Sequence, residues 1–286
     1  MFDHISHHSR PVATQLGSPC LYTSLSARAL GASVVVGSKV GNDLSKEQLR
    51  PLYRAGVNTN YIRRVEGRTT SFRIDYENGV RRMWTISRCP SLTREDVATL
   101  PPSKCLHLGP ILSEIPNNVA MWLANRVEVS CLDAQGYLRK TLPDGRVQRV
   151  GWHDRRLLAR LDVLKLSANE AALLLGEKPS QRRFSKLGPK VVLVTRAGAG
   201  TTVWSEEEGL FNVPAFETQV RDATGSGDAL VGGMLVTWAR TNDLLWSVAV
   251  GSAVASFVVE RVRAKKFGTP RQIQKRANTL LNSSSS

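Results

Sequence analysis

Apolar residues recur in two alternating patterns along the chain. Continuous apolar runs, such as "SVVVG" from Ser33 and "KVVLVT" from Lys190, have the length and the β-branched content of buried strands. Between such runs, segments like "IPNNVAMWLANR" and the stretch after Gly227 repeat apolar residues at helical spacing. Strands that alternate with helices predict an α/β fold with a doubly wound, mostly parallel sheet. The ligand site of such a sheet lies beyond the carboxyl ends of its strands.

Residues 69–87 depart from this alternation. Two runs of period-two alternation flank Asn78-Gly79, a dipeptide that favours a two-residue turn, so the segment predicts a β-hairpin. We interpret the hairpin as a small β lid that excludes water from a site, and an antiparallel edge of the main sheet is the alternative. The apolar residues expected on one face of the hairpin are Phe72, Ile74, Tyr76, Val80, Trp84 and Ile86.

Length and composition indicate one large domain. The 286 residues are 42% hydrophobic, so we assign a single domain to residues 1–278 and expect a disordered tail over residues 279–286. No apolar run reaches the length of a membrane span, and the first residues lack the apolar core of a signal peptide. We therefore expect a cytoplasmic protein with no membrane partner. The four cysteines are far apart and form no CxxC motif, which indicates reduced thiols.

The formal net charge of +15 raises the alternative of nucleic-acid binding. The basic residues are scattered, and the densest groups, "RRLLAR" and "ERVRAKK", lie on expected helices without interleaved aromatic residues. We expect no dedicated nucleic-acid partner and interpret the charge as a solvated basic surface that attracts anionic substrates. His4, His7 and His8 could suggest a metal, but no cluster of carboxylate or cysteine ligands accompanies them, so we prefer a polar terminus.

The stretch "RDATGSGDAL", residues 221–230, places an acid beside a glycine turn at the start of a helix. The backbone N–H groups of Gly225, Ser226 and Gly227 can point at one spot, where the helix dipole favours a phosphate. Asp228 beside that spot fits a base that takes the proton of a hydroxyl attacking phosphorus. An ordinary N-cap is the alternative, because aspartate, serine and glycine are common at helix starts.

A second glycine motif, "RAGAGTTV" from Arg196, could mark a dinucleotide site. Such a site needs a helix after the glycines, whereas "TTVWS" predicts a strand, so we reject nicotinamide dinucleotide binding. A catalytically idle sugar-binding protein stays open as a different functional class. Its mark would be loss of the base, and Asp228 is present.

Five motifs together resemble the ribokinase (pfkB) family of sugar and nucleoside kinases. "DATGSGD" resembles the family signature before a long helix, "LGSPCLYTSLSARALGA" the N-terminal glycine pair, and "SKVGNDL" the VGxD turn. "LKLSANEAALL" resembles the strand and helix that carry NxxE, and "VVLVTRAGAGTTVW" resembles the TxGxxG turn. The resemblance extends from about Asp3 to Thr269. It implies a ribokinase-like fold with a small β lid and an ATP-dependent kinase activity.

The resemblance also implies roles for particular residues. Asp228 matches the catalytic base, and Gly225, Ser226 and Gly227 match the anion hole for the transferred phosphoryl group. Glu170 matches the acid that organises water around Mg²⁺. The expected nucleotide-binding residues are Thr195, Gly198, Gly200, Thr224, Ala253 and Phe257, and the expected substrate-binding residues include Asp3, Gly17, Ser18 and Asp43.

The acceptor is indicated by "DAQGYLR", which follows the expected strand "VEVSCL". Asp133, Gln135 and Arg139 then lie at the carboxyl end of a parallel strand, although a turn with a solvent-facing arginine is the alternative. The DxQGxxR pattern resembles the family branch that includes myo-inositol kinases. Carboxylates and amides suit a ring of hydroxyls, so we expect a small polyol or sugar, myo-inositol first, with a cytidine-like nucleoside second. We also expect a homodimer through the lid.

The chain departs from the family pattern in several places. Ser18 replaces the second glycine of the N-terminal pair, Ser167 the asparagine of NxxE, and Ala197 the first glycine of TxGxxG. The family has a strand before the residue that Asp3 matches, but only two residues precede Asp3. We therefore expect either a truncated start or a sheet that lacks this strand.

Overall fold

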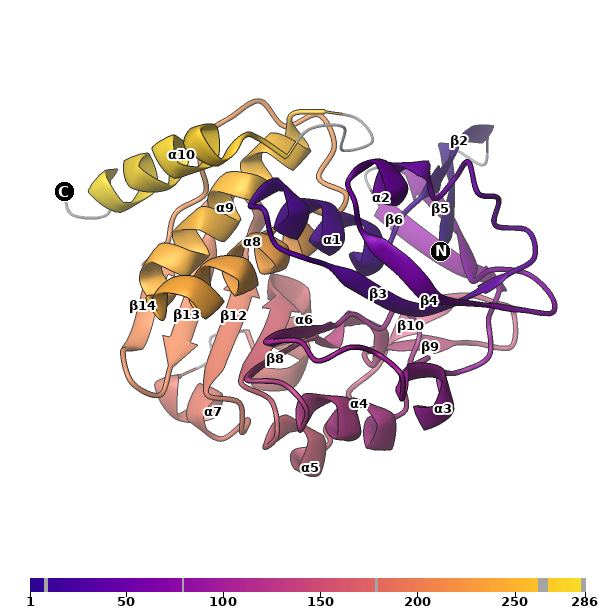
Figure 1. Cartoon of the computed structure of the whole chain (residues 1–286), viewed down its shortest axis with the longest axis horizontal. Coiled ribbons are helices and arrows are strands. Elements are labelled where there is room, and N and C mark those ends of the chain that lie inside the picture. The colour runs from indigo at the N-terminus through magenta and orange to yellow at the C-terminus, as the bar shows by residue number, and fades with distance from the viewer. Residues whose placement is uncertain (8–9, 79, 178–179, 262–266, 284–286) are drawn as a thin grey trace.

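A six-stranded sheet forms the centre of the computed structural model, which describes residues 1–7, 10–78, 80–177, 180–261 and 267–283. Its order is β14-β13-β12-β11-β8-β7. β7, β8, β11 and β12 are parallel, whereas β13 and β14 are antiparallel to their neighbours, which confirms a mostly parallel sheet (Figure 1). The strands are β7 Cys105–Leu108, β8 Val129–Asp133, β11 Val163–Ser167, β12 Val191–Thr195, β13 Thr201–Ser205 and β14 Gly209–Val213.

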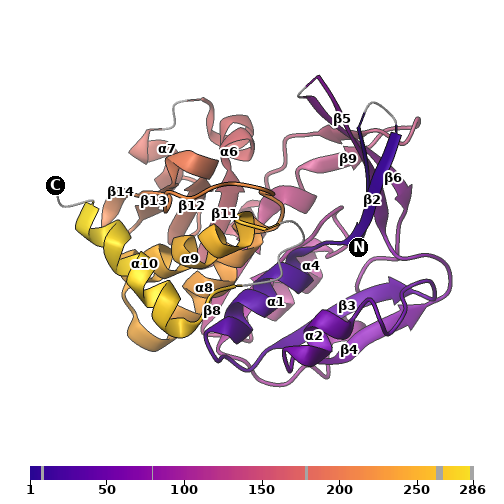
Figure 2. The same ribbon diagram turned by 90° about the horizontal axis from the view of Figure 1, so that it is seen from above.

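Helices cover both faces of this sheet, as Figure 2 shows. Val163 and Val191 pack against one helical layer and the adjacent Leu164 and Val192 against the other, because successive strand residues point to opposite faces. The first layer contains α1 Pro19–Ala29, α8 Ser226–Thr241, α9 Leu244–Val259 and α10 Pro270–Ser283. The second contains α4 Asn117–Ala124, α5 Arg155–Leu158, α6 Ala168–Leu175 and α7 Gln181–Ser185. The fold is therefore doubly wound, as predicted.

The same alternation directs polar side chains towards one helical layer. Cys131 and Val163 belong to the core under α8 and α9, so Asp133 and Lys165, two positions further along, face the same side. The two residues are also direct neighbours in the β8–β11 register. Two polar groups are thus placed at the carboxyl ends of adjacent parallel strands, below the layer that contains α8.

A separate four-stranded sheet forms the lid. Its order is β2-β1-β5-β6, with β1 Phe2–His7, β2 Arg10–Leu16, β5 Ser71–Glu77 and β6 Val80–Ser87. The expected hairpin is β5–β6, and β1 joins it by pairing in parallel with β5. Figure 2 shows this sheet beside the main domain, with the short hairpin of β9 Arg139–Thr141 and β10 Val147–Arg149 next to it. The N-terminal strands therefore make the lid larger than predicted.

The prediction of which residues share the inner face of the hairpin is wrong for β6. The turn has two residues, so paired positions have opposite parity, and Ile74 lies opposite Met83. Ile74 and Phe72 are buried in a cluster with Ile111. Asn78 has a φ of 50°, and Gly79 lies outside the described residues. Of the β6 residues expected on the same face as Ile74, Val80 is 54% exposed, Ile86 is 48% exposed, and Trp84 pairs with Arg73 on the other face.

The prediction of a disordered tail from residue 279 is wrong for residues 279–283. These residues continue α10, in which Ile273, Ala277 and Leu280 are buried, the first two in the core that α9 also lines. Their spacing places them on one helical face, and burial of that face keeps the helix folded to its end. The domain therefore extends to at least Ser283. Residues 284–286 lie outside the described residues.

A parallel pair of strands, β3 Val35–Gly41 and β4 Asn58–Val65, is separate from the main sheet. Two short helices, α2 Arg50–Arg54 and α3 Arg94–Val97, lie close to this pair in space. Asp3 lies in the lid strand β1. Among the described residues, no strand pairs with the outer edge of β7. The main sheet therefore lacks the first strand that the family resemblance implies.

The cysteines form no disulfide, and His4 contacts a threonine. The four cysteines are free thiols. His4 Nδ1 lies 3.0 Å from the Thr14 hydroxyl, and His8 lies outside the described residues. Within the described parts of the chain, no helix has both the length and the apolar character needed to cross a membrane.

Candidate active site

The glycine turn at the start of α8 is shaped by close contacts. Gly225 is the N-cap with a φ of 78°, and a Cβ at this position would lie 2.3 Å from Cγ of Tyr22. Ser226 uses its N–H and its hydroxyl to bond the carbonyl of Ala223. Among the described residues, no side chain caps the first turn of α8, so its remaining N–H groups are available to an anion.

Asp228 is a buried acid in the first turn of α8 and is only 9% exposed. Burial, reinforced by the nearby Asp133 carboxylate, raises the pKa of Asp228 to about 7. Lys165 and Arg139 act in the opposite direction and favour the ionised form. A carboxyl group that titrates near neutral pH is suited to general-base catalysis, so Asp228 has the properties expected of the base.

Lys165 is a buried cation that the sequence prediction missed. Its Nζ donates to Oδ2 of Asp133 at 2.7 Å. Burial alone would lower the pKa of Lys165, but the carboxylates of Asp133, Glu170 and Asp228 raise it. A lysine between two leucines of an expected buried strand is a signal that could have identified it. Asp133, which was expected to contact substrate, is fully buried against Lys165, so direct contact requires a movement that uncovers it.

His107 on β7 is a second polar group that the sequence prediction did not include. Its Nδ1 lies 3.0 Å from the Thr23 hydroxyl, and that hydroxyl donates to the backbone carbonyl of Asp228 at 3.0 Å. The single hydroxyl proton is used in this second bond, so Nδ1 of His107 is the donor in the first. Burial lowers the pKa of His107 to about 4, which keeps the ring neutral. The two bonds connect β7 through Thr23 of α1 to the backbone of Asp228.

Asp3 and Gly17 form a close pair between the lid and the start of α1. A Cβ at Gly17 would lie 2.6 Å from Oδ2 of Asp3, so only glycine fits there without displacing the carboxylate. Asp3 is buried, and its Oδ1 has no hydrogen-bond partner among the described residues. Burial also raises the pKa of Asp3. An unsatisfied buried oxygen is costly, and a substrate hydroxyl would satisfy it.

Gln135 and Arg139 lie together, whereas Asp43 is engaged elsewhere. Arg139 Nη2 donates to Oε1 of Gln135 at 2.9 Å, so these two expected substrate residues form one unit. Oδ1 of Asp43 accepts from the N–H and the hydroxyl of Thr69 at 2.8 and 2.6 Å. Asp43 therefore holds the segment that leads into lid strand β5, and its contact with substrate stays a prediction.

The expected nucleotide turn connects β12 and β13. Gly200 has a φ of 84°, and a Cβ there would lie 2.3 Å from the carbonyl oxygen of Val213, while Gly198 is exposed with open space around it. Ala197 has a φ of 50°, a conformation that favours glycine, which is the residue of the family motif at this position. Thr195 donates its hydroxyl to the carbonyl of Leu166 at 3.3 Å. The N–H of Thr224, in the loop before α8, donates to Oδ1 of Asp222.

The residues expected to form the adenine pocket are covered by other side chains. Ala253 has no exposed surface and belongs to the core, so it can support such a pocket only from behind its neighbours. The guanidinium of Arg276 lies 3.6 Å from the ring centre of Phe257 and 4.5 Å from that of Phe216. An ion pair with Glu260, at 2.7 Å, holds it there. A base that stacks on this face of Phe257 must displace Arg276.

Glu170 takes part in a capping box at the start of α6. Its Oε2 accepts from the N–H of Ser167 at 2.7 Å, and the Ser167 side chain accepts from the N–H of Glu170 in return. Serine can cap a helix as asparagine does, so the replacement preserves the local structure. Among the described residues, no group of three or more His, Cys, Asp or Glu side chains could hold a metal. Mg²⁺ keeps most of its water ligands, so a water-mediated site near Glu170 is compatible with this arrangement.

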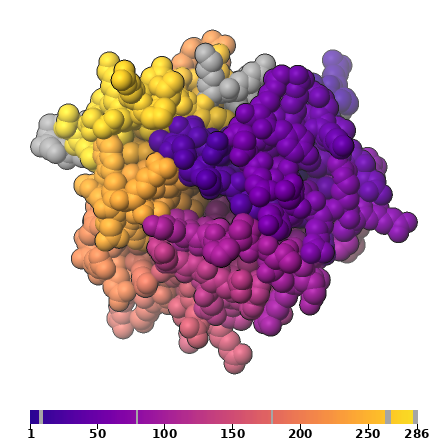
Figure 3. Space-filling model, viewed as in Figure 1, coloured from indigo at the N-terminus to yellow at the C-terminus, as the bar shows by residue number. Residues whose placement is uncertain are grey.

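One cluster unites residues from both halves of the chain. Asp228, Lys165, Asp133, Arg139 and Glu170 interact electrostatically, and Arg139 also interacts with Asp3. Figure 3 shows the indigo N-terminal segment beside the yellow and orange C-terminal segments, in agreement with the contact between α1 and α8. A buried acid, a buried cation and a glycine turn at a helix start together suit phosphoryl transfer to a hydroxyl.

The sequence matches characterised kinases over most of its length. A family model described as pfkB family carbohydrate kinase matches residues 23–270. An ATP-dependent 6-phosphofructokinase of Thermoanaerobacterium thermosaccharolyticum is 24% identical, over 87% of this chain and 80% of the relative. An inositol 3-kinase of Arabidopsis thaliana is 24% identical, over 90% and 70%, and a cytidine kinase of Thermococcus kodakarensis is 24% identical, over 87% and 89%.

Solved structures of kinases share the fold. A pyrophosphate-dependent kinase in the ribokinase family, in a sulfate complex, has a TM-score of 0.80 and 22% identity and covers 96% of both chains. A pyrophosphate-dependent kinase of that family with a pyrophosphate analog and myo-inositol has a TM-score of 0.77 and 22% identity, over 97% of this chain and 100% of the other. Fructokinase with bound ATP from Xylella fastidiosa has a TM-score of 0.76 and 19% identity, over 100% and 97%.

Proposed function

This chain belongs to the pfkB family of carbohydrate kinases, and we propose that it transfers the γ-phosphoryl group of ATP to a hydroxyl of myo-inositol or a similar small polyol. The observation that carries this proposal is Asp228, a buried acid beside the anion-binding turn whose pKa is raised by burial to about 7. The family relatives named above are phosphotransferases that act on alcohol groups. Use of ATP is supported by the ATP-dependent relative and by the ATP-bound fructokinase.

The residues of the cluster divide the chemistry between them. Asp228 accepts the proton of the acceptor hydroxyl, whose oxygen forms the new bond to phosphorus as the bond from phosphorus to the donor breaks. The turn of residues 225–227 binds the transferred phosphoryl oxygens. The unsatisfied oxygen of Asp3 and the Gln135–Arg139 unit orient the acceptor hydroxyls. The lid sheet excludes water, which otherwise competes with the acceptor.

We place the phosphoryl donor on the other side of the turn of residues 225–227 from the acceptor. Thr195, Gly198, Gly200 and Thr224 border the donor phosphates in this proposal, and Phe257 stacks the base once Arg276 has moved. Glu170 would hold magnesium through water, and the ion would supply positive charge to neutralise the donor phosphates.

The choice of acceptor is supported by polar groups and by relatives. Asp3, Gln135 and Arg139 offer oxygen acceptors and N–H donors, which match a ring of hydroxyls. One relative is an inositol 3-kinase, and one neighbouring structure contains myo-inositol. The alternative acceptor is a cytidine-like nucleoside, in line with the cytidine kinase among the relatives.

A screen of ADP release tests this proposal. ATP is offered with inositols, pentoses, hexoses and nucleosides, and we expect myo-inositol to give the highest kcat/KM. Turnover of a nucleoside with none on inositol would replace the acceptor and leave the kinase assignment intact. Binding of a sugar without turnover of any acceptor would identify the idle sugar-binding protein instead.

Inorganic pyrophosphate is a second candidate donor. The observation that favours it is Arg276, which covers the ring of Phe257 and leaves a guanidinium where a nucleobase would stack. Two structures with the same fold are pyrophosphate-dependent kinases. The same screen with pyrophosphate in place of ATP, read by phosphate release, decides between the donors. A higher kcat/KM with pyrophosphate than with ATP selects it.

The lid supports the proposal of a homodimer. Its outer face has a hollow of about 710 Å³ lined by Arg73, Asp75, Glu77 and Arg82 among others. A face with both signs of charge can pair with itself across a twofold axis. Sedimentation velocity should then show a dimer of the parent chain, and a monomer at every concentration would rule out this pairing.

A further inference from the structure

Lys165 lies against the backbone of the anion-binding turn. A Cβ at Gly227 would lie 3.0 Å from Nζ of Lys165 and 3.2 Å from its Cε. Gly227 does not have a left-handed φ, so its backbone would accept other residues. The end of the Lys165 side chain therefore lies beside Gly227, within reach of an anion bound at the turn.

The ammonium of Lys165 has N–H donors that no described residue uses. Lysine carries three N–H donors, and the described residues use one of them, in the bond to Oδ2 of Asp133. Asp133 Oδ1 accepts from the N–H of Gln135, so the carboxylate is fixed at both oxygens and holds Lys165 in place. Two N–H groups stay available beside the spot at which the turn binds an anion.

The charges around Lys165 mean that an anion bound there needs a cation beside it. Asp133, Glu170 and Asp228 are acids, and His107 is held neutral by burial. Arg139, the other cation of the cluster, is bonded to Gln135 and to the carbonyl of Ile111. A phosphoryl group entering among these acids meets Lys165 as the cation next to the turn.

We propose that Lys165 is a catalytic residue that donates from Nζ to an oxygen of the phosphoryl group in transfer. This inference rests on the proposed kinase function and extends it. Lys165 keeps its proton throughout: the acceptor proton goes to Asp228, the acceptor oxygen bonds phosphorus, and the donor diphosphate or phosphate leaves. The ammonium stabilises negative charge on the phosphoryl oxygens while this occurs. Asp133 is then a positioning residue that orients Lys165.

Four variants separate this role from that of a simple counter-ion to Asp133. They are Lys165→Met, Asp133→Asn, the double variant with both changes, and Lys190→Met as a control. Lys190 forms an exposed ion pair with Asp162 at 2.9 Å, away from the cluster. The double variant keeps a neutral pair of similar size, so it avoids the unpaired buried carboxylate that could unfold Lys165→Met. Thermal unfolding checks that each variant is folded.

We expect Lys165→Met and the double variant to lose about 10²–10³ in kcat, as after removal of one donor to a transition-state oxygen, with the acceptor KM nearly unchanged. Asp133→Asn should lose less, and Lys190→Met nothing. Lys165 would be shown to be only a counter-ion if the double variant were as active as Asp133→Asn, or if Lys165→Met stayed within a few-fold of the parent.

A binding measurement keeps the test independent of turnover. Calorimetric titration with inorganic pyrophosphate should give at least about tenfold weaker binding to the double variant than to Asp133→Asn. If the parent turned over no acceptor, the kinase proposal would fail, but this titration would still test the contact of Lys165 with phosphate. Equal affinities of the two variants would overturn it.

Discussion

Asp228 combines burial with a need for ionisation, and the two requirements oppose each other. Its raised pKa means that the folded chain binds this proton more tightly than the unfolded chain does. The resulting contribution to stability is present below the usual pKa of an aspartate, near 3.8, and is lost as the pH rises through about 7. The ionised form that catalysis needs is therefore the form that destabilises the fold.

Asp228→Asn should separate activity from stability. We expect turnover to fall by about 10²–10⁴, because general-base help is lost, while donor affinity is kept. Thermal unfolding at pH 8 should shift upwards by at least about 2 °C, because the buried charge is gone, with no upward shift at pH 4. In the parent, kcat/KM should fall about tenfold per pH unit below pH 7. Turnover of the variant within a few-fold of the parent would remove Asp228 from the mechanism.

Gly17→Ala tests the assignment of Asp3 to the acceptor. The new Cβ would lie 2.6 Å from Oδ2 of Asp3 and must displace that carboxylate. We expect the acceptor KM to rise by at least about tenfold, with the donor KM unchanged. Gly151→Ala is the matched control, because nothing lies within 4 Å of its Cβ position. An unchanged acceptor KM in Gly17→Ala would separate Asp3 from acceptor binding.

Residues whose chemistry depends on local sequence were predictable, and residues that depend on strand neighbours were not. The turn and Asp228 were predicted because a helix start is a local feature. Ser18 and Ala197 were recognised as departures, and both have a positive φ, 124° and 50°, that glycine adopts more easily. Lys165 was missed because its partner Asp133 comes from another strand, 32 residues away. The chain alone does not give the register that brings the two together.

At the level of elements, the packing of α10 is the clearest departure from expectation. Leu280→Ala should lower the free energy of unfolding by about 2–5 kcal/mol, because Leu280 is only 3% exposed and its truncation would leave a cavity. Asn278→Ala, on the exposed side of the same helix, is the control. Urea unfolding measures both. Equal effects of the two substitutions would mean that this end of the helix does not contribute to the core.

The errors at element scale have different physical causes. The tail was predicted to be disordered from its serine-rich composition. However, Ile273, Ala277 and Leu280 repeat at helical spacing directly before the serines, and all three are buried. In the hairpin the turn was recognised, but its two residues reverse the parity of the inner face. The partners of β5 also include β1, a contact over about seventy residues that no local pattern reports. Pairing across long separations was therefore the part of the fold that could not be predicted.

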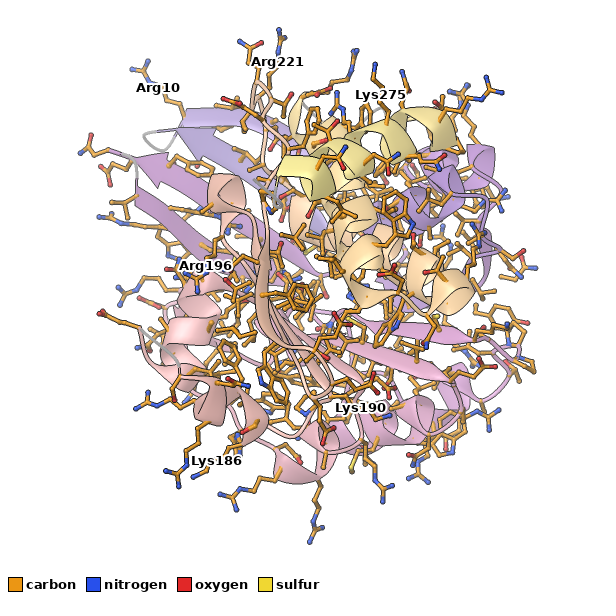
Figure 4. The ribbon with its side chains drawn as sticks, turned by 90° about the vertical axis from the view of Figure 1, so that its left-hand side faces the viewer. Arg10, Lys186, Lys190, Arg196, Arg221 and Lys275 are labelled. Atoms are coloured by element: carbon orange, nitrogen blue, oxygen red, sulfur yellow. The ribbon has the colours of Figure 1, made fainter. Side chains whose placement is uncertain are left out.

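At the scale of the whole molecule, the net charge of +15 creates a positive electrostatic potential around the protein. Figure 4 shows the labelled lysine and arginine side chains pointing outwards from separate elements, without one stripe that would follow a nucleic-acid backbone: Arg10, Lys186, Lys190, Arg196, Arg221 and Lys275. A diffuse positive field attracts any small anion, including a phosphoryl donor.

The donor KM should therefore depend on ionic strength. Between roughly 0.05 and 0.5 M salt we expect it to rise several-fold, because ions screen charges over about 10 Å at 0.1 M. The KM of an uncharged polyol should stay within about twofold over the same range, which makes it the internal control. Steady-state kinetics at fixed pH measure both constants. A donor KM that does not change with salt would show that the surface charge has no part in capture.

The separation of β3 and β4 from the main sheet has a dynamic consequence. The pair has no described backbone ladder to β7, so it can open as a small cooperative unit while the six-stranded sheet stays intact. Asp43 follows β3 directly and holds Thr69, where the lid begins. Amide hydrogens of β3, β4 and the segment into β5 should then exchange with solvent at a common rate, earlier than those of β8, β11 and β12. Opening of the β3–β4 pair would release the lid. The lifetime of the closed lid would then depend on this pair and not on the cluster around Asp228.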